Sequence, residues 1–156
     1  MKKTGIWMLV ILCGAAGVFQ DIPKGWAYTD EINAKVEDVW KAAQEIFEPI
    51  GIHKKNEKKK TLESIWIQDD VVRSRGWLKK LDKQHFRRRY KIRGKFKQAY
   101  DFVKVEISLN VQDLPQSGVR ENMWRSVKPD YQDYQIEKET FMKILMRVEE
   151  YRKQSP

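Results

Sequence analysis

The chain has 156 residues, and its 31 lysines and arginines outnumber its 22 aspartates and glutamates, which gives a formal net charge of +9. The single cysteine cannot form a disulfide within the chain. The positive charge favours anionic partners, such as lipid headgroups, lipopolysaccharide phosphates, acidic polymers or acidic protein faces.

The first 27 residues are predicted to be a cleavable secretory signal. Met1-Lys2-Lys3 supplies a positive start, and an uncharged, mostly apolar stretch follows from Gly5 to Phe19. A transmembrane helix needs about 20 apolar residues, so an uncleaved anchor is the second interpretation of this segment and a buried helix the third.

Small residues suggest where the signal is cut. Gly25 and Ala27 stand at the spacing that signal peptidase prefers, which predicts cleavage before Tyr28. Ala15-Ala16-Gly17 offers a rival, earlier site. Cys13 follows Leu12 rather than a small residue, so we interpret it as an apolar residue of the signal and keep lipidation as the alternative.

The predicted domain spans residues 28–156. Removing the signal takes away three lysines and one aspartate, so the formal charge falls from +9 to +7 and the domain stays basic. Its length suits one hydrophobic core of ordinary size. We expect an exported domain, in the periplasm or peripherally on the outer membrane, and this location disfavours nucleic acid as a partner.

The first helix is predicted over residues 36–47. Apolar side chains recur there at helical spacing, and Pro49 and Gly51 follow as stop signals. Residues 28–35, just upstream, alternate weakly and are predicted to contain a first strand.

Beyond Gly51 the hydrophobic period changes to two, which predicts an antiparallel sheet of about five strands. The clearest strand is residues 103–111, where aliphatic and polar residues alternate. The other strands are expected at residues 51–57, 62–68, 71–78 and 85–93, with a short edge strand at 119–124.

The C-terminus carries the strongest helical signal. Pro129-Asp130 offers a start, and we expect a helix of about 15 to 20 residues whose apolar stripe packs across the sheet. The residues of this stripe are Phe141, Ile144, Leu145, Val148 and Tyr151. The predicted fold class is therefore α+β, an antiparallel sheet with a helix on its N-terminal side and a long C-terminal helix packed on it.

Three segments are similar to the start of a known domain family. They read Lys35-Val-Glu-Asp-Val-Trp-Lys-Ala-Ala42, Glu48-Pro-Ile-Gly51-Ile and Thr61-Leu-Glu-Ser-Ile-Trp66. This order of helix, glycine, charged turn and strand ending in tryptophan resembles the helix-grip domains of BamC-like outer-membrane assembly lipoproteins. The resemblance covers about residues 32–67 and, by architecture, the closing helix. It implies a module of envelope assembly, although those lipoproteins have two such domains.

No catalytic constellation is found in the sequence. His53 and His85 lie in basic segments and have no second ligand at metal-binding spacing, so we expect neither a metal nor another cofactor. Asp69 and Asp70 are predicted to form a solvated turn between two strands rather than an acid-base pair. The chain is therefore predicted not to be an enzyme.

The basic segment at residues 85–93 is the most distinctive pattern. Alternation in a strand would place four of its basic residues on one face, and the preceding run could add more together with Trp77. The predicted anion-binding residues are Arg73, Arg75, Arg87, Arg89, Lys91 and Arg93. The alternative is a solvated face that Glu63 and Glu106 partly neutralise across neighbouring strands.

Arg88 is the exception in this segment, because alternation places it on the apolar face with Phe86 and Tyr90. A buried arginine must find a carboxylate, sit at the rim of the sheet, or face a cavity that holds a ligand. We predict that Arg88 faces a cavity.

Three functions from different classes remain. The first is a non-catalytic envelope module that docks on other proteins. The second is a carrier of a lipid or other amphiphile between the sheet and the C-terminal helix. The third is a binder of anionic envelope polymers through the basic strand.

Overall fold

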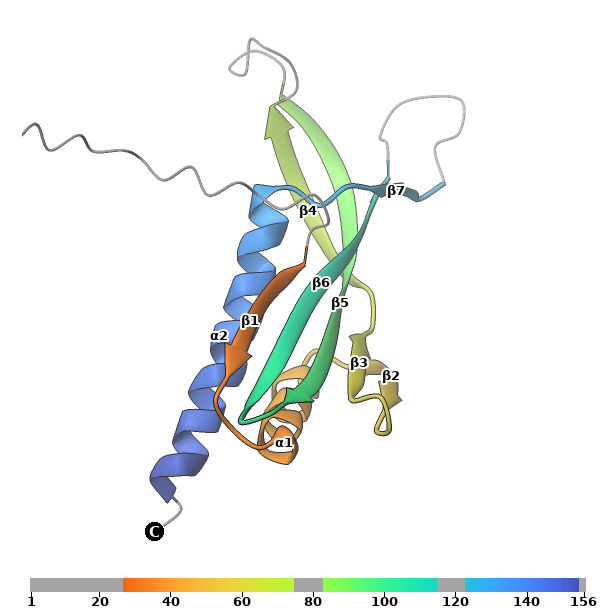
Figure 1. The fold of residues 1–156 in the computed structure, drawn as a ribbon. Coiled ribbons are helices and arrows are strands. Elements are labelled where there is room, and N and C mark those ends of the chain that lie inside the picture. Colours follow the sequence, from red (N-terminus) through yellow and green to blue (C-terminus); the bar gives the residue numbers. More distant parts are fainter. Residues whose placement is uncertain (1–26, 75–82, 115–122, 155–156) are drawn as a thin grey trace, which may run out of the picture.

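The computed structural model describes residues 27–74, 83–114 and 123–154 (Figure 1). The predicted signal up to residue 26 therefore lies outside the described residues, and so do Cys13, Arg75 and Trp77. The elements are β1 (Tyr28–Ile32), α1 (Val36–Phe47), β2 (Ile52–Asn56), β3 (Thr61–Ser64), β4 (Ile67–Ser74), β5 (Lys83–Ala99), β6 (Phe102–Leu114), β7 (Arg125–Val127) and α2 (Tyr131–Gln154).

A long antiparallel hairpin of β5 and β6 forms the centre of the sheet (Figure 1). Its register runs from Arg87 opposite Leu114 to Ala99 opposite Phe102. β3 and β4 pair with successive parts of the free edge of β5, and β1 and β7 do the same along β6. β2 pairs with β3 and closes the path β1-β6-β5-β3-β2. All these pairings are antiparallel, so the predicted α+β fold class is confirmed.

One face of the sheet is apolar and both helices cover it. The alternate residues of β6 from Val103 to Val111 are buried, as the period-two pattern predicted. On α1, Trp40 packs edge-on against Phe96 of β5, with ring centroids 5.9 Å apart. On α2, the Phe141 ring lies 5.1 Å from that of Tyr28 on β1. The core therefore lies between the sheet and the two helices.

The predicted first helix matches α1 at both ends. The backbone N–H of Val36 donates to the side chain of Gln98 on β5, which satisfies one N-terminal group of the helix. The chain then turns at Gly51, whose φ of +96° lies in the left-handed region that favours glycine. This turn directs β2 back along the sheet.

The C-terminal helix begins where Pro129-Asp130 predicted it. The Asp130 carboxylate accepts from the backbone N–H groups of Gln132 and Asp133, and the Asp133 carboxylate accepts in return from the N–H of Asp130. This reciprocal capping stabilises the first turn. With 24 residues, α2 is longer than expected, and Leu145 in its predicted apolar stripe is only half-buried.

Several predicted strands differ from the observed ones: the described sheet has seven strands rather than about five, the strand expected at 71–78 is observed as Ile67–Ser74, and the one expected at 85–93 extends over Lys83–Ala99. The strand expected at 62–68 is interrupted after Ser64, and β4 starts at Ile67 as a separate element. Of the edge strand expected at 119–124, residues 119–122 lie outside the described residues, and the observed β7 starts at Arg125. Among the helices that the structure describes, none is long and apolar enough to cross a membrane.

Candidate functional site

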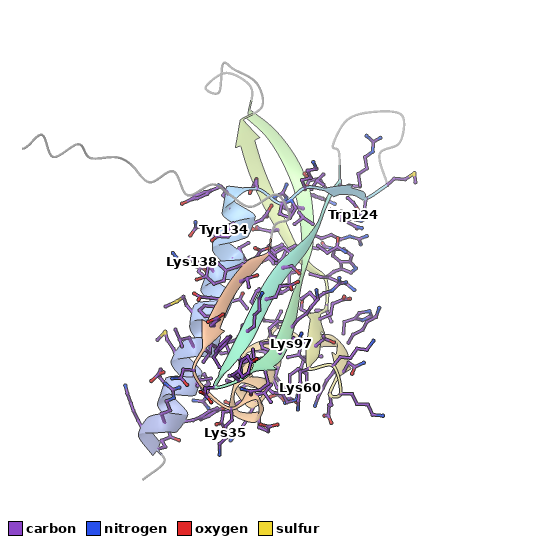
Figure 2. The ribbon with its side chains drawn as sticks, viewed as in Figure 1. Lys35, Lys60, Lys97, Trp124, Tyr134 and Lys138 are labelled. Carbon is purple, nitrogen blue, oxygen red and sulfur yellow. The ribbon has the colours of Figure 1, made fainter. Side chains whose placement is uncertain are left out.

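The face of the sheet opposite the helices carries a cluster of two tryptophans and one arginine, which we call the Trp-Arg cluster. The guanidinium carbon of Arg89 on β5 lies 4.4 Å from the ring centroid of Trp66 and 4.3 Å from that of Trp124. Trp66 precedes β4 and Trp124 precedes β7, so strands on both sides of β5 and β6 deliver the rings. Figure 2 shows Trp124 on the side of the molecule away from Lys138 of α2.

Among the described residues, no carboxylate holds Arg89 in place. Its Nε donates to Oε1 of Gln112 on β6 at 2.8 Å, and it forms no ion pair with any residue that the structure describes. Cation–π contact on two rings restricts the guanidinium, which has further N–H groups beyond the one that Gln112 accepts. The Trp-Arg cluster therefore presents half-exposed hydrogen-bond donors of Arg89 that are already held in position. They lie on a sheet face that no described helix covers, which we call the open sheet face.

Next to the Trp-Arg cluster, Glu63 of β3 neutralises two of the predicted anion-binding residues. Lys91 donates to one carboxylate oxygen of Glu63 at 3.1 Å, and Arg93 donates to the other at 2.7 Å. Burial would raise the pKa of the Glu63 carboxyl, but these hydrogen bonds and charges lower it below its usual value. This part of the basic strand is neutralised across the strands, as the alternative interpretation of the sequence predicted, but the Glu63 and Lys91 side chains are largely buried rather than solvated.

The other predicted basic residues are not gathered in one place. Glu106 pairs with Lys95, further along β5, rather than with an arginine. Arg73 of β4 lies opposite Gln84 of β5. Alternation along β5 puts position 84 on the same face of the sheet as Arg88. The strand register therefore differs from the predicted grouping of Arg73 with Arg87 and Arg89, while the Arg73 side chain lies outside the described ones. Arg87 is exposed and stays a candidate anion-binding residue.

Arg88 is buried on the helix-facing side and its guanidinium finds carboxylates. Nε and Nη2 donate to the two oxygens of Asp113 at 2.7 and 3.0 Å, and Nη1 donates to both oxygens of Asp133. Burial opposes the charge of Arg88, but the two carboxylates outweigh it and raise the pKa of Arg88. Arg88 does border a polar hollow of about 360 Å³ with Asp69 and Arg87, but its guanidinium is engaged in these ion pairs.

The expected turn at Asp69 and Asp70 is also wrong. Both residues lie inside β4, opposite Arg88 and Arg87 respectively. The register of β4 and β5 therefore places each of these aspartates opposite an arginine. His53 lies in β2 and His85 in β5, and the described residues contain no group of three side chains that could hold a metal ion.

A groove of about 620 Å³ opens between the C-terminal part of α1, the start of α2 and the β4–β5 edge. Its floor is apolar, and Glu45, Glu139 and Lys143 stand at its charged rim. The apolar lining consists of Ile46, Ile50, Ile67, Tyr90, Ile92 and Ile136. Grooves of this size and character accommodate small amphiphilic molecules.

Sequence reasoning missed the tryptophans of the Trp-Arg cluster. In the sequence, Trp66 marks only the end of a predicted strand, and Trp124 only the end of the predicted edge strand. Alternation identified the face of Arg89, but the approach of both rings depends on strand pairings between distant parts of the chain. The one sequence signal for this cluster is that a tryptophan directly precedes each of two strands that flank the β5–β6 hairpin, Trp66 before β4 and Trp124 before β7.

Known proteins resemble this chain distantly. A DUF4468 family protein from Bacteroides ovatus has a TM-score of 0.46 and 10% identity, covering 78% of this chain and 85% of that chain. A TBP-like protein from Parabacteroides distasonis has a TM-score of 0.43 and 10% identity, covering 79% and 92%. No protein-family model and no curated protein matches the sequence. The resemblance to BamC-like domains stays a prediction.

Proposed function

We propose that this chain is a non-catalytic docking module of the cell envelope and that a partner protein binds the open sheet face. The observation that carries this proposal is the packing of Arg89 against Trp66 and Trp124 on a face that no described helix covers. Tryptophan and arginine dominate the binding energy of protein interfaces. Side chains that are already ordered lose little conformational freedom on binding, so this cluster suits an anchor point.

The charges around the Trp-Arg cluster indicate the chemistry of the partner. Arg89 has no acidic partner among the described residues, and Arg87 beside it on β5 is exposed. A carboxylate of the partner can accept hydrogen bonds from the unused N–H groups of Arg89 while apolar side chains contact the indole rings. The partner surface is therefore acidic with an apolar centre, which agrees with the basic charge of the chain.

Site-specific photo-crosslinking in the producing cells tests this proposal. The crosslinker replaces Asn110, an exposed residue opposite Lys91 on the open face, or as a control Lys138 on the outer side of α2. We expect a discrete protein adduct from position 110 and none from position 138. Arg89→Gln should abolish this adduct, whereas Lys153→Gln, which removes the same charge at the end of α2, should leave it intact.

Two results would contradict the docking proposal. One is equal adduct formation from both faces, since that indicates non-specific contact. The other is an adduct from position 110 that survives Arg89→Gln and Trp66→Ala, because the Trp-Arg cluster would then contribute nothing to binding.

The groove supports a second candidate, transport or storage of an amphiphile. Its apolar floor can take an acyl chain, and Lys143 at the rim can pair with an anionic headgroup. The groove lies between the sheet and α2, on the opposite side of the sheet from the Trp-Arg cluster. The two candidates can therefore be tested independently.

A fluorescent fatty acid, cis-parinaric acid, is a suitable probe for the groove. We expect saturable binding that Ile50→Trp weakens strongly, because the larger ring fills the groove. Met142→Trp on the exposed side of α2 is the matched control and should bind as the wild type does. Equal binding by both variants, or no saturable binding by the wild type, would exclude the groove as an amphiphile site.

A further inference from the structure

Glu137 is a fully buried carboxylate that joins α2 to two strands. Its Oε1 accepts from the backbone N–H of Leu109 on β6 at 2.9 Å, and its Oε2 accepts from the backbone nitrogen of Tyr28 at 3.0 Å. Tyr28 is the first residue of β1, the edge strand that pairs with β6. The Glu137 carboxylate therefore connects the start of β1 to α2 through a hydrogen bond.

This carboxylate lacks a positive partner within the described residues. Burial raises the pKa of Glu137 to about 7, while its two backbone hydrogen bonds lower it and the charge of Asp133, one turn earlier, raises it. Arg88, which pairs with Asp133 and Asp113, forms no ion pair with Glu137. A buried carboxylate with amide donors alone is a costly arrangement near neutral pH.

We propose that proteolytic cleavage of the Ala27–Tyr28 bond completes this site, because the new α-ammonium group of Tyr28 forms an ion pair with the buried carboxylate of Glu137. An endopeptidase of the signal-peptidase class supplies the catalysis and water is the co-reactant. The C–N bond breaks, the hydroxyl group joins the Ala27 carbonyl carbon, and a proton goes to the Tyr28 nitrogen. The resulting amine takes a further proton from solvent and becomes the ammonium.

Only cleavage directly before Tyr28 places a positive charge beside the Glu137 carboxylate; cleavage at an earlier site does not. Cleavage at Ala15-Ala16-Gly17, or retention of the segment, leaves a neutral amide at Tyr28 and the same uncompensated carboxylate. Cleavage before Tyr28 places a full positive charge on an atom that already lies at hydrogen-bond distance from Glu137. The mature domain would thus be more stable than its precursor, whatever the open face or the groove binds.

Two versions of the domain test this inference. One begins at Tyr28, released from a fusion that leaves no extra residue, and the other carries one glycine before Tyr28. We expect the first to melt several degrees higher at pH 7, and we expect Glu137→Gln to remove the difference. Carboxyl NMR should place the Glu137 pKa near 7 in the glycine-extended form and well below 7 in the Tyr28 form. Each pKa unit of difference between the two forms corresponds to about a tenfold larger folding constant for the Tyr28 form.

The pH dependence follows from the sign of the shift. Pairing raises the pKa of the α-ammonium in the folded state, so its stabilisation is present below the unfolded value of about 7.7 to 8.0 and is lost as pH rises through the folded value. Other charged or titratable groups around the site are Asp133 and Tyr134 on α2, Arg88 on β5, and Asp30, which accepts from the Tyr28 hydroxyl. Both versions of the domain contain all of them, so they cancel in the comparison.

Three outcomes would overturn the inference. The first is equal melting of the two versions. The second is equal titration of Glu137 in both, which remains decisive even if the Glu137→Gln variant does not fold. The third is an N-terminus other than Tyr28 in the protein isolated from its native envelope, whereas a start at Tyr28 supports the proposal.

Discussion

Arg88 of β5 donates from Nη1 to both carboxylate oxygens of Asp133 on α2, at 3.1 and 2.9 Å. The two residues are 3% and 2% exposed, so the ion pair lies inside the molecule. Through Nε and Nη2, Arg88 also reaches Asp113 on β6. This buried network ties the start of α2 to the central hairpin, in the half of the molecule opposite α1.

Removal of Asp133 is expected to destabilise the domain strongly. Asp133→Ala leaves the buried Arg88 with only one of its two close carboxylates and also removes an acceptor for the N–H of Asp130. Breaking a buried pair in this way costs about 3–5 kcal/mol. Urea denaturation measures the effect, and Gln132→Ala at the exposed neighbouring position serves as control. A loss no larger than that of the control would mean that the network contributes no stability.

Two adjacent residues of α2 should differ in their contribution to the core. Ile144 is fully buried, whereas Leu145 is half-buried at the edge of the core. Ile144→Ala should therefore lower the free energy of unfolding by about 2–5 kcal/mol, and Leu145→Ala by clearly less. Thermal or urea unfolding of both variants checks this order. The opposite order would show that α2 is rotated relative to the sheet.

Glu63 should make stability depend on acid pH. Its folded pKa is lowered, so its contribution is present above the unfolded pKa of about 4.3 and is lost as pH falls through the folded value. Glu63→Gln should cost about 1–3 kcal/mol at pH 7 and progressively less as pH falls, since it weakens hydrogen bonds from Lys91 and Arg93. Urea unfolding at several pH values measures this, and a constant cost at all pH values would contradict it.

Local patterns were sufficient to predict much of the fold. The apolar spacing around Trp40 predicted α1 at its observed ends, and the alternation along β6 predicted which of its faces is buried. The antiparallel arrangement and the position of the closing helix followed from the same periodicities. These features depend on residues close together in the chain.

Features that depend on distant pairings could not be predicted in this way. The interruption of the strand at Ile65 and Trp66 has no composition signal, and it places Trp66 against Arg89. The burial of Glu137 in α2 contradicts the usual exposure of glutamate, and only the backbone N–H groups of Tyr28 and Leu109 explain it. Register between strands likewise decided that Asp69 opposes Arg88.

Hydroxyl-radical footprinting of the protein in the cells that produce it tests the docking account most directly, because it compares both faces of the molecule in one sample. The account predicts that oxidation of Trp66 and Trp124 falls several-fold relative to the purified protein. Met142 and Met146, exposed on α2, should oxidise equally in both samples. Unchanged oxidation of both tryptophans, or an equal fall at the tryptophans and the methionines, would contradict a partner on the open sheet face.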